Sequence, residues 1–100
     1  LLQHPEIFLM ALFAETVLGF SPLYRLQWEE AQGRHVILYP EGMVELNVPA
    51  AETLKLCDGK RNLGEIVHML ETKFDTSGLW DDVEELVNAA IDHGWIRIVS

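Results

Sequence analysis

The stretch that decides the fold covers residues 36–59 and reads VILYPEGMVELNVPAAETLKLCDG. Its β-branched and aromatic start ends at Pro40–Gly42, a turn in which proline fixes φ and glycine lets the chain reverse. Apolar and polar residues alternate along Met43–Val48, which predicts a strand with one buried face. A helix that opens at Asn47 and stops at Gly59 is expected next. The stretch specifies a shape closely and carries no recognisable catalytic group, so it favours a binding module.

The residues before this stretch complete a small sheet. Apolar and polar residues also alternate along Tyr24–Trp28, and Ala31–Arg34 has the composition of a hairpin turn. His35–Tyr39 is rich in β-branched and aromatic residues and is predicted as the next strand. Together with Met43–Val48, these strands form a three-stranded antiparallel meander with two open edges.

Three helices and a short strand are expected after the meander. The apolar positions recur at helical spacing, and they are Ala50, Leu54 and Cys57 in the first helix, Leu63, Ile66, Val67, Leu70 and Phe74 in the second, and Val83, Leu86, Val87, Ala90 and Ile91 in the third. The expected end signals are a capping box of Asn62 and Glu65, a cap at Asp81 or Asp82, and a stop at Gly94. Trp95–Val99 is the last strand. The predicted fold class is α+β, resembling a winged helix-turn-helix.

The apolar N-terminus is predicted as a separate helical extension, residues 1–20, ahead of a domain at residues 21–100. A helix over Ile7–Phe20 would be apolar nearly all round and must be buried. It can pack on its own domain, pack against a second copy as a homodimer through residues 7–20, or belong to an upstream extension. The run is shorter than the roughly 20 apolar residues that span a bilayer, and it lacks signal-peptide features, so no membrane contact is expected. The single cysteine, Cys57, suits a reducing compartment, and the cytoplasm is the expected location.

Charge and motif content argue against several function classes. The net charge of −9, with seven scattered basic residues, disfavours nucleic acid as a partner. The third helix, Trp80–His93, would be repelled from DNA because it carries acids and no Lys or Arg. The histidines are too dispersed for a metal site, and neighbouring carboxylates such as Glu84 and Glu85 do not converge on one point. We therefore expect no metal, no cofactor and no enzymatic activity.

Several short motifs, in order and spacing, resemble those of the PqqD family, the small protein of pyrroloquinoline quinone (PQQ) biosynthesis. The resemblance covers about residues 21–98. The matching segments are Leu38-Tyr39-Pro40-Glu41-Gly42, Leu46-Asn47, Ala50-Ala51, Cys57-Asp58-Gly59, Ile66–Leu70, Asp82-Val83 and Gly94-Trp95-Ile96.

The resemblance implies a peptide chaperone that binds the precursor peptide PqqA and presents it to the radical SAM enzyme PqqE. It also implies that the peptide adds as an antiparallel strand to the edge of the third strand and lies in a groove against the third helix. The residues expected to bind peptide are Met43, Val44, Glu45, Leu46, Asn47, Val83, Leu86, Val87 and Ala90. Most of the helix residues among them should belong to the core, so two or three are expected to touch peptide.

Two consequences can be tested. Replacing Val44 by proline removes a backbone N–H from the edge strand and is expected to weaken peptide binding. The alternative function is a non-catalytic structural or oligomerising protein, driven by the apolar N-terminus. Titration with the precursor peptide discriminates the two, because only a chaperone shows saturable binding.

Overall fold

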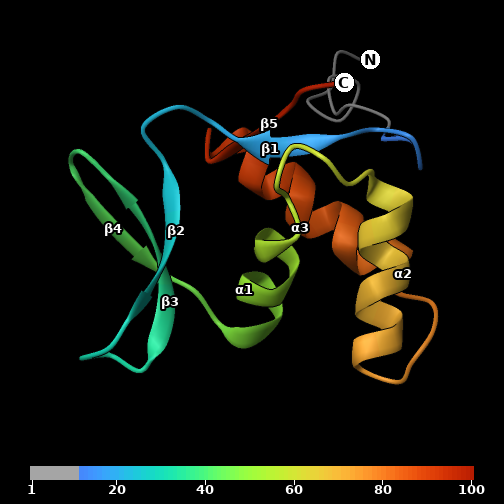
Figure 1. Ribbon diagram of the computed structural model, residues 1–100, viewed down its shortest axis with the longest axis horizontal. Helices are drawn as coiled ribbons and strands as arrows, with labels where there is room; N and C mark the ends of the chain where they lie inside the picture. The colour runs from blue at the N-terminus through green and yellow to red at the C-terminus, as the bar shows by residue number, and fades with distance from the viewer. Residues whose placement is uncertain (1–11) are drawn as a thin grey trace, which may run out of the picture.

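The computed structural model describes residues 12–100, which fold into an α+β arrangement of two small sheets and three helices (Figure 1). A three-stranded antiparallel sheet has the order β2-β3-β4, and β1 and β5 form a second antiparallel pair. The elements in chain order are β1 Leu18–Phe20, β2 Arg25–Glu29, β3 Arg34–Tyr39, β4 Gly42–Glu45, α1 Val48–Lys55, α2 Leu63–Lys73, α3 Trp80–Asp92 and β5 Ile96–Ile98. The predicted order of meander, helices and last strand is confirmed.

The meander places β3 in the centre and leaves β2 and β4 at its edges. Gly33 takes a φ of +67° in the β2–β3 turn, a conformation that glycine adopts without steric cost. β4 ends at Glu45, earlier than the predicted end at Val48, which lies instead in α1. The cause is Asn47, whose side chain accepts a hydrogen bond from the N–H of Ala50 at 2.9 Å and so begins the helix.

The predicted start signals hold at α1 and α2 but not at α3. The predicted stop holds at α3, where Gly94 follows the cap with a φ of +82°, whereas α1 already ends at Lys55, before Cys57 and the expected stop at Gly59. In α2 the capping box is complete, since the backbone N–H groups of Asn62 and Glu65 each donate to the other side chain at 2.8 Å. The prediction that Asp81 or Asp82 caps α3 is wrong, because both lie inside its first turn. The residue before α3, Leu79, instead donates its N–H to the carboxylate of Glu71 at 3.0 Å, which ties the start of α3 to α2.

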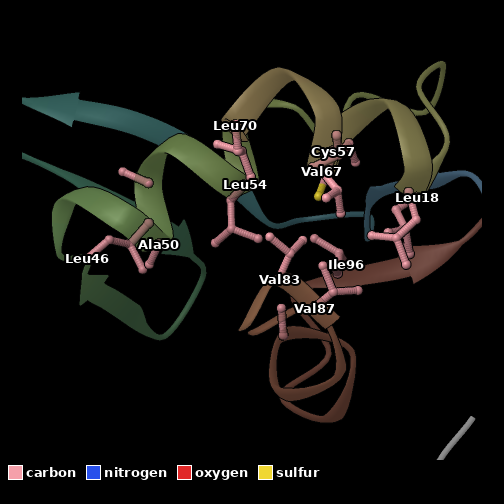
Figure 2. Packing of buried hydrophobic residues seen from close by; sticks show 14 of the residues in the cluster. Leu18, Leu46, Ala50, Leu54, Cys57, Val67, Leu70, Val83, Val87 and Ile96 are labelled. Atoms are coloured by element: carbon pink, nitrogen blue, oxygen red, sulfur yellow. The ribbon is translucent and has the colours of Figure 1, made fainter. Parts of the chain in front are cut away.

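The core lies between α1 and α2 on one side and α3 with β5 on the other. Figure 2 shows Leu54, Val67 and Leu70 pointing toward Val83 and Ile96 across this space. All of these side chains are buried. Burial of each such side chain stabilises the fold by about 1.5–3 kcal/mol, which makes this cluster the main source of stability.

The predicted N-terminal helix is wrong over its described part, residues 12–20, while residues 7–11 lie outside the described chain. Leu18–Phe20 form β1, and Leu18 is fully buried in the domain's own core. Backbone bonds explain the strand: the N–H of Gly59 donates to the carbonyl of Leu18 at 2.7 Å, and β5 pairs along the other side. A Cβ on Gly19 would lie 3.2 Å from the Cα of Gly59, so glycine permits this close approach. The partners of these bonds, Gly59 and β5, lie far away in the sequence. The apolar run is therefore buried as a strand, which its own residue pattern does not indicate.

Candidate functional site

The open edge of β4 offers backbone hydrogen-bonding groups at two residues. The N–H of Leu46 donates to the carbonyl of His35 at 3.0 Å, and bonded pairs alternate along an antiparallel ladder. Val44 is therefore in a bonded pair with Ile37, and its N–H faces β3. The backbone groups of Met43 and Glu45 face the open edge instead. Val44→Pro would break the sheet itself, so it is not a selective test of strand addition at this edge.

Shortly after β4 the chain enters the wall of a hollow of about 420 Å³ between α1, the end of α2 and the start of α3. Its floor and walls are mostly apolar, with polar groups at the rim. The lining residues are Asn47, Pro49, Ala50, Thr53, Leu70, Phe74, Thr76, Leu79, Asp82, Val83 and Leu86. An apolar hollow with a few polar groups is suited to hold side chains of a ligand and to orient it.

The structure separates the predicted site residues into three groups. Asn47, Val83 and Leu86 line the hollow. Met43 and Glu45 are exposed on the edge strand, Glu45 within 3.4 Å of Arg34. The others face the interior: Val44 is half-buried beside Ile37, and Leu46, Val87 and Ala90 are buried in the core.

Sequence reasoning missed the part of the hollow that the α2–α3 connection builds. Phe74 follows the last residue of α2, and its side chain is 44% exposed although it continues the apolar stripe. Leu79 and Thr76 come from the loop that follows and line the same hollow. The available signal was Phe74, an apolar residue that continues the stripe of α2 beyond the helix end. The sequence does not show which way its side chain points, because that depends on the loop that follows.

Acidic groups dominate the charge around α3. Asp82 lies at the rim of the hollow, and the outer face of the helix carries Asp81, Glu84, Glu85 and Asp92 around a separate shallow depression. The nearest basic residue on α2, Lys73, is held 2.9 Å from Glu52 of α1, which also contacts Lys55 at 2.9 Å. Hydrogen bonds from Lys55 and then Lys73 lower the pKa of Glu52, so it stays ionised and joins α1 to α2. Any ligand therefore meets a negative field along α3.

The described residues offer little for catalysis. Burial, aided by the neighbouring charge of Asp58, raises the pKa of Cys57 to about 12, so its thiol is protonated at neutral pH and is a poor nucleophile. Within residues 12–100, His, Cys, Asp and Glu nowhere gather in a group of three or more that could hold a metal ion. The same residues include no helix long and apolar enough to cross a membrane.

Comparison with known proteins identifies the family. Residues 34–96 match the family model for coenzyme PQQ synthesis protein D (PqqD). The PqqA binding protein of Methylococcus capsulatus (strain Bath) is 58% identical over 88 residues, which cover 88% of this chain and 95% of the relative. The PqqA binding protein of Kluyvera intermedia is 49% identical over 80 residues, 79% of this chain and 87% of the relative.

A solved structure shows the same fold. It is the solution NMR structure of the PqqD truncation of Methylobacterium extorquens PqqCD, described as a stand-alone recognition element for ribosomally synthesised and post-translationally modified peptides. It is similar with a TM-score of 0.72 at 24% identity, over 87% of this chain and 95% of that chain. Sequence motifs, family match and relatives agree, and the chain belongs to the PqqD family.

Proposed function

We propose that this protein is a non-catalytic chaperone of PQQ biosynthesis that binds the precursor peptide PqqA and presents it to the radical SAM enzyme PqqE. The observation that carries the proposal is the joining of a free edge strand, β4, to an apolar hollow. The names of the relatives support PqqA as the ligand.

PqqA adds antiparallel to β4 and takes its backbone hydrogen bonds from Met43 and Glu45. Such edge addition draws affinity from the main chain and specificity from pockets for alternate side chains. The hollow begins beyond Glu45, at Asn47, and receives apolar side chains of the peptide against Val83 and Leu86. Leu46, Val87 and Ala90 do not touch the ligand. They pack in the core and fix the position of the wall of the hollow.

The single cysteine of the chain supports the cytoplasm as the place where the protein works. Its helices α2 and α3 with the meander resemble a winged helix that does not bind DNA. The acids of α3 support this last point, since they would meet the phosphate backbone with like charge. Asp82 at the rim of the hollow favours a peptide with a basic residue at that position.

We also propose a homodimer formed through residues 7–20, and the exposure of Phe13 supports it. Leu12 and Leu18 pack in the chain's own core, but Phe13 leaves 64% of its surface exposed. Light scattering with and without PqqA separates the two functions. A dimer that binds no peptide would support the structural alternative, and saturable peptide binding supports the chaperone.

Glu45→Pro tests strand addition directly. The N–H that proline removes faces the open edge, so the β3–β4 ladder and the fold should be retained. We expect the affinity for PqqA, measured by calorimetry, to fall about tenfold or more. Glu45→Ala is the matched control, since it also loses the contact with Arg34 but keeps the N–H. Wild-type affinity in the folded Glu45→Pro variant would refute edge addition at β4.

A further inference from the structure

The turn that leads into β2 holds a leucine in a conformation suited to glycine. In the turn Ser21–Tyr24, the N–H of Tyr24 donates to the carbonyl of Ser21 at 3.2 Å. Pro22 takes the second position and Leu23 the third, with a φ of +73°. A positive φ at the third position defines a type II turn, where glycine or asparagine is the usual residue.

Leu23 combines a strained backbone with an exposed apolar side chain. Its left-handed backbone is strained for a residue with a Cβ. Its side chain is 77% exposed, more than any other large apolar side chain in residues 12–100. Burial in the core does not account for a leucine in this conformation, and strained residues gather where surfaces contact ligands or partners.

The surroundings of Leu23 form a contiguous surface, the Leu23 patch. A shallow hollow is lined by Leu23, Tyr24, Arg25, Leu38, Tyr39 and Pro40. The rings of Tyr24 and Tyr39 stack with their centroids 5.5 Å apart, which joins the start of β2 to the end of β3. The Leu23 patch is thus a mainly apolar surface with one positive charge.

The Leu23 patch borders the strand that we propose as the peptide's docking edge. Leu38 pairs directly with Met43 of β4, which is itself 43% exposed. A strand antiparallel to β4 passes Glu45 first and Gly42 last. The residues that follow the bound segment therefore leave the sheet beside the Leu23 patch, at the β3–β4 turn, which points away from the helices (Figure 1).

We propose that the Leu23 patch is the docking surface for the enzyme that receives the bound peptide. The inference rests on the proposed function and adds the partner's site. A partner bound there would meet the emerging peptide without covering the hollow. Within residues 12–100 no carboxylate forms an ion pair with Arg25, so the matching surface is an apolar depression flanked by acids. The acidic outer face of α3 repels such a partner, which leaves the meander as its approach.

Leu23→Asn tests the docking surface without harming the fold. Asparagine tolerates the left-handed conformation, so the midpoint of urea unfolding should be kept or raised. We expect the affinity for PqqE, measured by biolayer interferometry, to fall about tenfold or more, and Arg25→Glu to weaken it further. Met69→Gln is the matched control, because Met69 is an exposed apolar residue on α2, away from the meander.

PqqA titration of the same proteins separates this proposal from the proposed function. Unchanged PqqA affinity in Leu23→Asn, with loss of PqqE binding, supports the docking surface. PqqA binding together with wild-type PqqE affinity in Leu23→Asn overturns the docking surface alone. A wild-type protein that fails to bind PqqA overturns the proposed function. If Leu23→Asn converts a wild-type dimer to monomer, the Leu23 patch is a self-interface and the enzyme is not its occupant.

Discussion

At the scale of single residues, Cys57 shows how burial removes reactivity. It lies just beyond α1, its side chain is 1% exposed, and its thiol lies 3.7 Å from the carbonyl of Thr53. The sequence predicted a small buried hydrophobe on an apolar helix face; the structure confirms the burial but places the residue beyond the helix end. The thiol therefore belongs to the core and not to the site.

We expect iodoacetamide at pH 8 to leave Cys57 unmodified in the native protein and to label it fully in urea, as mass spectrometry would show. The ordinary pKa of 9.0 applies in the unfolded chain, whereas in the folded chain burial raises it to about 12. As the pH rises above 9.0, only the unfolded chain loses this proton, so the free energy of unfolding should decrease. Rapid labelling of the native protein at pH 8 would contradict the assigned burial. Cys57→Ala controls for modification at other side chains.

At the scale of secondary-structure elements, the chain's local signals are strongest where side chains satisfy helix ends. Asn62 and Glu65 close the capping box of α2, and Asn47 ends β4 by capping α1. Leu79 takes the equivalent position in α3 without a side-chain cap, and Glu71 of α2 accepts the bond from its N–H. Two helix starts were therefore readable from neighbouring residues, whereas the third depends on packing against another helix.

Asn62→Ala should lower the free energy of unfolding by about 1 kcal/mol, because it removes the acceptor for the N–H of Glu65. Urea denaturation followed by circular dichroism measures the change. Asn62→Ser is the matched control, since serine is also a good cap and should retain most of the stability. Equal losses in both variants would mean that the side-chain amide acts through contacts other than the cap.

At the scale of the whole molecule, the two-stranded sheet of β1 and β5, here called the clasp, pairs the N-terminal and C-terminal parts of the described chain beside the helices (Figure 1). The carbonyls of Thr16 and Leu18 accept bonds from Leu63 and Gly59, which begin and precede α2. The meander lies beside α1 on the side away from α2 (Figure 1), and it includes β4 and most of the Leu23 patch. The clasp stabilises the fold, and the meander carries the proposed contacts.

Leu18→Ala should lower the free energy of unfolding by about 2–5 kcal/mol, because the side chain is fully buried where β1 meets the core. Phe13→Ala is the control from the same segment. Phe13 is larger but 64% exposed, and its removal should change stability by no more than about 0.5 kcal/mol. Unfolding midpoints in urea would show the contrast. A loss for Leu18→Ala as small as the one expected for Phe13→Ala would place Leu18 outside the cooperative core.

The site was predictable in part, for reasons that differ between residues. The family resemblance implied peptide contacts on the third strand and the third helix, and of the residues expected there Asn47, Val83 and Leu86 line the hollow. Val87 belongs to the same stripe but faces the core, since the stripe is wider than the hollow. The α2–α3 loop that brings Leu79 to the hollow carries no repeating pattern, so its contribution was missed.

The sequence by itself determined the meander, the helices and the caps at Asn47 and Asn62, because these depend on alternation, helical spacing and neighbouring hydrogen-bonding groups. Only the tertiary structure decided that Leu18–Phe20 are a strand, that Val44 turns its N–H toward β3 and that Leu23 borders the proposed docking edge. These outcomes depend on bonds and contacts between residues distant in the chain. Local propensity does not encode such pairings, since the free energy that selects them comes from the partner segment.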